Sequence, residues 1–326
     1  MADDRGSPDL IISLLPGIYA ADKNKLLDHF NSEDDLFTAS KSDIEKIVNH
    51  GLKKFWDISE VRDRAGRIDT ICRMRSIKWV PLTSPEYPPL LRETYDPPPV
   101  IYYKGVLPNP EKSLVGIVGT RKPSRQAGEQ AYKIAGNLGR AGVSVISGLA
   151  LGIDSMAHRG NLIGYAPGYA VLGSGVDGIY PASNKPLAKR ILDSGGALIS
   201  EYPPGTPPGK WTFPARNRII AALSRGVLVA EAPLKSGALI TASFALEQGK
   251  DLWVASCGVQ NDDSAGQFDK RGTTRLAADG AEIIYSACDI LEKWSLLDTD
   301  IVKNVSSGSS REEAVSSVAG LLKIEI

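Results

Sequence analysis

The chain has 326 residues, 42% of them hydrophobic, and its 38 basic side chains balance its 38 acidic ones. A chain of this length folds as about two domains and needs no disulfide or metal to complete its core. The absence of net charge excludes a globally basic nucleic-acid coat and a polybasic membrane binder. Any site for a polyanion must therefore be a local patch.

The cysteines and the start of the chain indicate the cellular compartment. Cys72, Cys257 and Cys288 are far apart and form no C-x-x-C motif, which favours a reducing compartment and gives no metal signature. The acidic start lacks the positive and apolar regions of a secretory signal, and no apolar run approaches the ~20 residues of a membrane span. We expect a soluble, cytoplasmic protein without a membrane partner.

Residues 1–79 have the apolar spacing of three and four that predicts a small all-helical domain, as at Leu26, Leu27 and Phe30. Its segment LLPGIYAADKNKLLDHF resembles the helix, turn and helix of helix-hairpin-helix modules, which contact the DNA backbone. Such hairpins usually carry a second glycine where this chain has Tyr19. A helical packing or protein-contact domain is the favoured alternative.

Two segments flank the rest of the chain as linkers. Residues 80–113 contain nine prolines, which exclude a regular helix and favour extended chain, so we expect a linker that wraps a domain edge. Residues 295–326 read as a polar linker and a short C-terminal tail, too short for an independent domain.

Residues 114–294 alternate short apolar runs with stretches long enough for helices, which predicts a parallel sheet with crossover helices. The fold class is α/β, with an extended Rossmann-like, doubly wound sheet after the helical domain. Ligands bind beyond the carboxyl ends of such strands, so the loops after the runs are the candidate sites. The runs are LVGIV, VSVIS, YAVLG, ALISE, VLVAE, LWVAS and EIIY.

Two of these loops combine basic residues with the start of a helix, where free N–H groups attract anions. Alone, the first would favour a plain strand-helix turn with solvated basic residues. The residues are Gly119, Thr120, Arg121 and Lys122, with Ser124 as the helix cap, after the first run, and Lys235, Ser236 and Gly237 after the fifth.

The loop after the second run carries glycines but no clear catalytic group. Gly148 and Gly152 allow close backbone approach. We expect Asp154 to cap the following helix rather than to act as a general base, and His158 to be a satisfied structural histidine. The remaining histidines, His29 and His50, suggest no metal cluster.

The loop after the third run formally matches the dinucleotide fingerprint G-x-G-x-x-G. Pro181 prevents the immediate helix that the fingerprint requires, so a loop that cradles phosphate fits better. Its candidate residues are Gly173, Ser174 and Gly175 for phosphate, Tyr180 as a flat stacking surface, and Lys185 for positive charge.

The loop after the fourth run interleaves basic and aromatic side chains, which is the pattern that single-stranded nucleic acid needs. A dimer or edge contact is an equally good explanation, because Trp, Phe and Arg are also interface residues. The residues are Lys210, Trp211, Phe213, Arg216 and Arg218.

In order, the motifs from Leu114 to Leu291 resemble the DNA-processing protein A family, also called DprA or Smf, and the N-terminal helices are similar to its sterile-alpha-motif-like (SAM-like) domain. These motifs are GIVGTRKPS, SGLALGIDSMAHRG, AVLGSGVDGIYPASN, ISEYPPGTPP, FPARNRIIAALSRGVLVAEAPLKSGALITASFALEQGK and KRGTTRLAADGAEII.

The resemblance implies a bacterial cytosolic protein that binds and protects single-stranded DNA and helps load the RecA recombinase during natural transformation. It implies a homodimer, no catalytic reaction and no cofactor. The arginine of the family's glycine-serine/threonine-arginine motif falls on Arg121, and the basic residue of its K/R-S-G motif falls on Lys235. By position in matching loops, the resemblance adds Lys185, Arg216 and Arg218, with glycines at 119, 148, 173, 175 and 237 near phosphate.

The sequence differs from the family pattern in two places, and one alternative function remains. The short tail cannot supply the winged-helix domain of many members, and Ala182 stands where some relatives carry a basic residue. The alternative function is that of a LOG-type nucleoside-phosphate hydrolase, whose P-G-G-x-G-T-x-x-E signature supplies a catalytic glutamate. The matching region here lacks the glycine pair and has Glu247 well down its helix.

Overall fold

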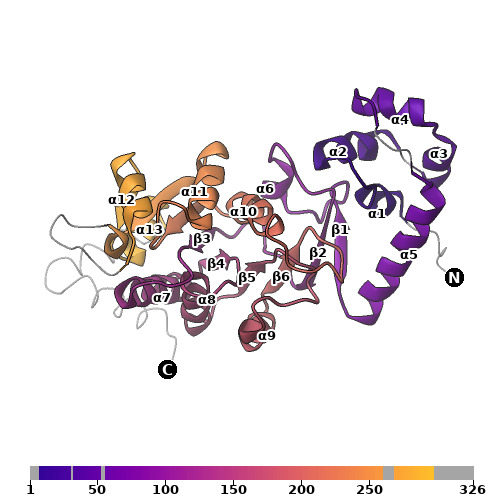
Figure 1. Cartoon of the computed structure of the whole chain (residues 1–326). Coiled ribbons are helices and arrows are strands. Elements are labelled where there is room, and N and C mark those ends of the chain that lie inside the picture. Colours follow the sequence, from indigo (N-terminus) through magenta and orange to yellow (C-terminus); the bar gives the residue numbers. More distant parts are fainter. Residues whose placement is uncertain (1–6, 31, 53–55, 260–267, 297–326) are drawn as a thin grey trace, which may run out of the picture.

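The computed structural model describes residues 7–30, 32–52, 56–259 and 268–296, which form a helical part followed by a nine-stranded sheet covered by helices (Figure 1). The expected tail, apart from residues 295 and 296, lies outside the described residues. No helix in the described ranges is long and apolar enough to cross a bilayer.

The helical part packs around its own apolar core, which includes Leu26 and Ile44. The segment that resembles a helix-hairpin-helix folds as two helices joined by a tight loop, in which Gly17 has a φ of 78°. Trp56 fixes this loop, because its indole N–H donates to the Pro16 carbonyl at 2.7 Å. The helices are α1 (Pro8–Ser13), α2 (Ala20–His29), α3 (Glu33–Thr38), α4 (Lys41–Val48) and α5 (Ile58–Met74).

All seven apolar runs form strands, and they are parallel to one another in the sheet. The sheet has the order β1-β2-β6-β5-β4-β3-β7-β8-β9, so the chain builds outward from β3 first on one side and then on the other. Such a reversal is the topological switch point where doubly wound sheets bind ligands. The strands are β3 (Leu114–Val118), β4 (Ser144–Ser147), β5 (Gly168–Val171), β6 (Ala197–Ser200), β7 (Gly226–Val229), β8 (Asp251–Ala255) and β9 (Glu282–Ile284).

The proline-rich segment does more than link two domains. It supplies β1 (Lys78–Pro81) and β2 (Val100–Gly105), which pair antiparallel with each other, and β2 pairs antiparallel with β6. A single short helix, α6 (Pro89–Arg92), lies between them. Proline is compatible with strand ends and sheet edges because the missing N–H is not needed there, and it is compatible with a first helical turn for the same reason.

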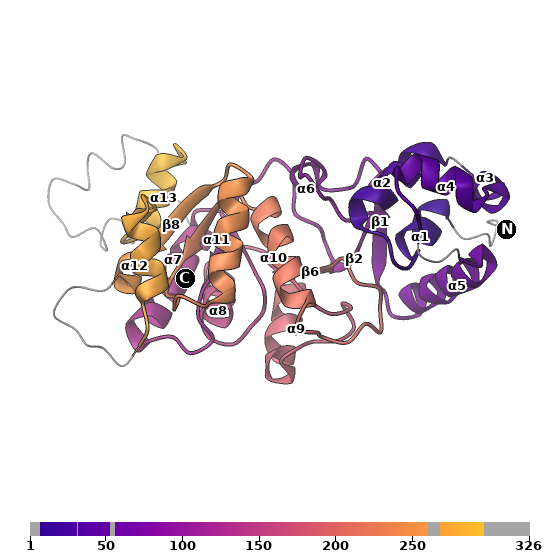
Figure 2. The ribbon, with the colours of Figure 1, turned by 45° about the horizontal axis from the view of Figure 1, so that its top comes forward.

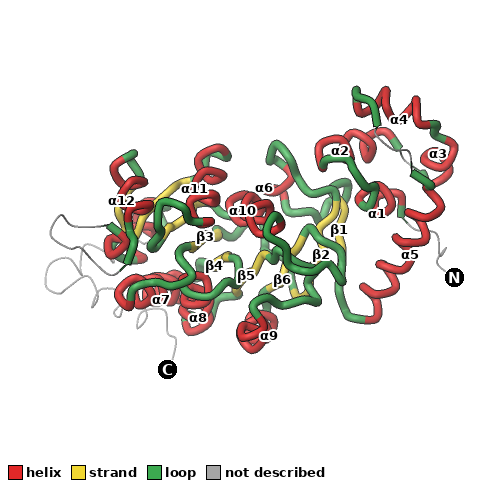
Figure 3. The backbone as a smooth tube through the Cα atoms, in the orientation of Figure 1, coloured by secondary structure: helices red, strands yellow, loops and turns green. Residues whose placement is uncertain are grey.

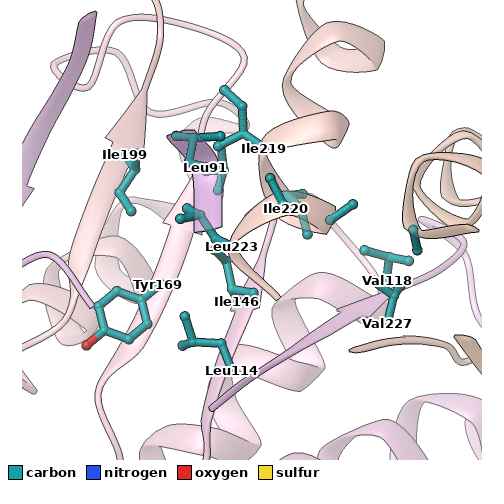
Figure 4. Packing of buried hydrophobic residues seen from close by; sticks show 14 of the residues in the cluster. Leu91, Leu114, Val118, Ile146, Tyr169, Ile199, Ile219, Ile220, Leu223 and Val227 are labelled. Carbon is teal, nitrogen blue, oxygen red and sulfur yellow. The ribbon is translucent and has the colours of Figure 1, made fainter. Parts of the chain in front are cut away.

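Helices cover both faces of the sheet (Figures 1 and 2). Alternate residues of β3 face opposite sides, since Val115 and Ile117 join one core cluster while Leu114 and Val118 join another. Figure 4 shows the cluster that contains Leu114 and Val118. One face carries α7 (Arg125–Arg140), α8 (Ile153–Ile163) and α9 (Lys185–Asp193), and the other carries α10 (Thr212–Leu223) and α11 (Gly237–Glu247). Helix α12 (Arg271–Ala278) contacts β8, and α13 (Ala287–Lys293) contacts β9.

Strand β2 joins the helical part to the sheet (Figure 3). Val100 and Tyr102 belong to the helical core, whereas Ile101 and Tyr103 belong to the core of the sheet. The two sides of one strand thus complete two hydrophobic cores, and the helical part is packed against the sheet.

Candidate nucleic-acid interface

A cavity of about 680 Å³ lies where the switch point predicts it, beside the carboxyl ends of β3 and β7. We call it the switch-point pocket. It brings together eleven of the residues that the sequence predicts to contact nucleic acid, which are Gly119, Thr120, Arg121, Lys122, Tyr180, Lys210, Phe213, Arg216, Lys235, Ser236 and Gly237.

The loop after β3 is tied down at both ends. Ser124 caps α7 by accepting from the Ala127 N–H at 3.2 Å. The buried Glu231 carboxylate accepts from the Ser124 N–H at 2.8 Å and from its hydroxyl at 2.6 Å, while the Glu231 carbonyl accepts from the Thr120 N–H at 2.7 Å. Sequence reasoning missed this function of Glu231, although an acidic residue directly after a buried strand was its signal.

Four exposed cations surround the pocket without carboxylate partners among the described residues. Close to the same loop, the exposed Arg125 is instead paired with Glu129 at 2.7 Å. Free cations at one edge of a sheet can neutralise phosphates without first breaking an ion pair. The four are Arg121, Lys122, Lys210 and Lys235.

Aromatic rings lie beneath one of these cations. The Arg121 guanidinium carbon is 5.6 Å from the centre of the Phe213 ring, within the range of a cation–π contact. The ring of Tyr180, half exposed, lies 5.7 Å from Phe213, centre to centre. Rings beside free cations can stack bases while the cations bind phosphates.

Arg216 lines the pocket, but its side chain is buried and hydrogen-bonded within the protein. Only 5% of the residue is exposed, and its guanidinium donates to the Val171 carbonyl and, at 2.9 Å, to the Asn217 side chain. Burial lowers the pKa of Arg216, although the nearby Asp154 opposes this effect. Arg216 therefore supports the loops around the pocket, although the sequence pattern predicted that it binds phosphate.

Asp154 and His158 are buried close to Arg216. Gly152, not Asp154, occupies the cap position of α8, and Asp154 instead accepts from the N–H groups of Gly148 at 3.1 Å and Ala150 at 3.3 Å. Burial raises the pKa of Asp154 more than Arg216 lowers it. Burial also lowers the pKa of His158 to about 3, and neither ring nitrogen has a hydrogen-bond partner among the described residues, so this histidine is structural but not satisfied.

Three of the expected phosphate glycines are instead packing positions outside the pocket lining. A Cβ at Gly148 would lie 2.1 Å from the Arg216 guanidinium, one at Gly173 would lie 2.8 Å from the Phe213 ring, and one at Gly175 would lie 2.7 Å from the Pro203 carbonyl oxygen. Ser174 is buried, and its hydroxyl donates to the Gly178 carbonyl at 2.6 Å. By contrast, a Cβ added at Gly237, which was also expected near phosphate, would have nothing within 4 Å.

Three further candidates lie away from this pocket. Arg218 is paired with Glu201 at 2.5 Å and donates to the Asp96 carbonyl at 2.6 Å, because it lies on the opposite side of α10 from Arg216. Trp211 is 69% exposed and contacts Tyr202 edge-on at 5.7 Å. Lys185 is exposed at the start of α9 and does not line the pocket.

The model of the family described as DNA recombination-mediator protein A matches residues 78–295, which include both antiparallel strands and the whole parallel sheet. The chain belongs to this family. The resemblance to DprA and Smf proteins that the motifs predicted is thereby confirmed, and so is the Rossmann-like α/β class.

Individual relatives agree with this assignment. Protein Smf of Synechocystis is 36% identical over 297 residues, which are 89% of this chain and 73% of the relative. The X-ray structure of DprA from Streptococcus pneumoniae superposes with a TM-score of 0.68 at 32% identity, over 87% of this chain and 95% of that one. A Helicobacter pylori DprA structure, described as revealing a unique single-stranded DNA binding mode, has a TM-score of 0.57 at 28% identity, over 67% and 95%.

Proposed function

We propose that the chain binds and protects single-stranded DNA in the switch-point pocket and assists the loading of a RecA-type recombinase during natural transformation and recombination. The observation that carries the proposal is the set of four cations that line the switch-point pocket with Phe213 and Tyr180 and have no carboxylate partner in the described ranges. The single-stranded DNA binding mode described for the Helicobacter pylori relative supports it. The family's description as a recombination mediator supports the recombinase step.

The chemistry of binding follows from the geometry of the pocket. Arg121, Lys122, Lys210 and Lys235 neutralise successive phosphates, and the N–H groups at the start of α11 add a further anion contact. Phe213 and Tyr180 stack bases, which every base can do through its flat face. Binding is therefore salt-sensitive and almost independent of sequence.

The placement of the carboxylates favours binding over hydrolysis. Asp154 lines the pocket, but it is buried and accepts two backbone N–H groups of its own loop. Glu247, the residue considered for the hydrolase alternative, lies at the last position of α11 and does not line the pocket. We therefore propose that the protein is cytoplasmic, binds DNA without catalysing a reaction and needs no cofactor.

Helix α11 offers a surface for the proposed homodimer. Ile240 is 37% exposed and Leu246 is 60% exposed on this helix, and Leu234 just before it is 42% exposed. Exposed apolar groups gathered on one element are typical of protein interfaces. Two pockets held together bind a long strand more tightly than one, which compensates for the balanced net charge of each chain.

Fluorescence anisotropy on labelled single- and double-stranded oligonucleotides across a salt series tests the proposal. Arg121→Ala and Lys235→Ala should each weaken single-strand binding roughly tenfold or more, because each removes a charged contact. Each should also reduce the slope of log K against log salt by about 0.7. Arg125→Ala is the matched control, since it removes one exposed charge near the same loop but breaks only the Glu129 pair.

Failure of the wild-type protein to bind single strands at low salt contradicts the proposal, and nucleoside-phosphate hydrolysis then becomes the activity to measure. If binding is confirmed, the recombinase step is tested by the rate at which RecA ATPase activity appears on a strand coated by single-strand binding protein. An unchanged rate in the presence of this chain contradicts that step alone.

A further inference from the structure

A second cavity, of about 510 Å³, lies between the helical part and the sheet. We call it the hairpin pocket, because the loop between α1 and α2 lines it with residues 13–20. The other walls come from α5, from the segment that enters β2, from the chain after β6, and from α10. The residues used below are Tyr19, Lys23, Arg64, Asp96, Glu201, Trp211 and Arg218.

The two pockets share helix α10 and the segment before it as a common wall. Arg216 and Asn217 line the switch-point pocket, while Ala215 and Arg218 line the hairpin pocket. Likewise, Lys210 lines the first and the next residue, Trp211, lines the second. A DNA strand bound at Lys210 would therefore lie next in the chain to a residue that lines the hairpin pocket.

The hairpin pocket holds a cation without a carboxylate partner. The Lys23 ammonium donates to the Ser13 carbonyl at 2.6 Å and forms no ion pair in the part of the chain that the structure describes. Burial, and to a smaller extent the positive charge of Arg64, lower the pKa of Lys23 to about 8, against the weaker opposite effect of Glu201. An anion placed between Lys23 and Arg64 would relieve this repulsion.

The two carboxylates of the pocket differ in their partners. Arg218 pairs with Glu201 at 2.5 Å and also donates to the Asp96 carbonyl. One side-chain oxygen of Asp96 is buried and has no hydrogen-bond partner among the described residues. It is an acceptor for an incoming N–H, and each of the four DNA bases carries an N–H donor on its pairing edge.

Aromatic rings stand at the same pocket with most of their surface in solvent. Tyr19 is 83% exposed and Trp211 is 69% exposed, although both line the cavity. Large exposed rings beside a buried acceptor and free cations suit a base and its phosphate rather than a free inorganic anion. Tyr19 occupies the position where the helix-hairpin-helix pattern expects a second glycine, so the departure from that pattern supplies a ring.

We propose that the hairpin pocket binds a further nucleotide of the single strand held in the switch-point pocket, with its phosphate at Lys23 and Arg64 and its base on Trp211 and Tyr19. The inference rests on the proposed function. It extends the DNA path from the Rossmann-like sheet onto the helical part, which otherwise has no assigned ligand.

Anisotropy with two lengths of oligothymidylate tests this inference on the full chain. One strand is short enough to fill only the switch-point pocket, and the other has about 16 nucleotides. Lys23→Met keeps the apolar stem and removes the charge, and Trp211→Ala removes the ring. Both should weaken binding of the longer strand about fivefold to tenfold and leave the short strand unchanged, because a lost stacked base or phosphate contact acts only when the second pocket is filled.

Lys46→Ala is the matched control, since it also removes one charge from the helical part but lies on α4 in an exposed pair with Asp43. Wild-type binding of the longer strand by both hairpin-pocket variants overturns the inference, and so does an equal loss with Lys46→Ala. If Arg121→Ala leaves both lengths unaffected, the proposed function itself fails. Thermal unfolding of each variant checks that the hairpin still packs.

Discussion

The loop after β3 and helix α10 carry equally basic sequence, but their arginines serve different ends. Arg121 is exposed, unpaired among the described residues and placed over an aromatic ring, whereas Arg216 is buried and Arg218 is paired with Glu201. The difference follows from position. The loop projects beyond the sheet edge, while α10 lies against the sheet and turns its side chains into two pockets and a core. A basic residue in the sequence therefore does not by itself identify a side chain that is available to bind DNA.

The strongest test of this difference is to remove one buried arginine and one exposed arginine. Arg216→Ala should lower the free energy of unfolding by about 3–5 kcal/mol, because it leaves the buried Asp154 carboxylate without its compensating charge. Arg121→Ala should change stability by no more than about 0.5 kcal/mol, since its side chain is exposed. Urea denaturation measures both. Equal stability losses would mean that Arg121 also supports the fold.

The glycines offer a second and smaller contrast. Gly148→Ala should destabilise the protein by about 1–3 kcal/mol, because its Cβ would overlap the Arg216 guanidinium. Gly237→Ala is the matched change at an open position and should stay within about 0.5 kcal/mol. Thermal or urea unfolding of the pair is the measurement. A neutral Gly148→Ala would show that Arg216 can leave its site at little cost.

The third contrast is between the lysines of the two pockets, and it depends on pH. In the free protein the pKa of Lys23 is about 8, so this lysine loses its charge as the pH rises from about 7 to 9 while arginines and ordinary lysines keep theirs. Affinity for the longer strand should fall by up to about tenfold over that range, because phosphate binding requires the protonated form. Lys23→Met should remove this dependence. Anisotropy at constant ionic strength checks it, and a pH-independent wild type contradicts it.

The parallel sheet was predictable strand by strand. Runs such as LVGIV are apolar at every position because both faces of β3 are covered by helices, and no polar alternation blurs their limits. The antiparallel edge was not predictable in this way. The prolines of residues 80–113 correctly exclude a long helix, but they conceal β1 and β2. Strand β1 pairs with β2, and β2 joins the sheet through β6, almost a hundred residues later.

The site was predictable in its location and in part of its membership. The loops after β3 and β7 were named because parallel strands bring their carboxyl ends to one edge, and the structure places Arg121 and Lys235 in one pocket there. The glycines at 148, 173 and 175 look the same in sequence as Gly237, yet they make room for Arg216, Phe213 and Pro203 rather than for a ligand. Close approach of segments distant in the chain cannot be read from local spacing.

The sequence by itself determined the class of fold, the seven parallel strands, the family and the edge of the sheet where the candidate site lies, because these depend on local periodicity and on motifs contiguous in the chain. Only the tertiary structure decided which cations lack a carboxylate partner within the described part of the chain and which support the fold. It also decided that the hairpin loop and Trp211 line one cavity. Both outcomes depend on burial and on partners far apart in the sequence, such as Asp154 with Arg216 or Lys23 with Arg64.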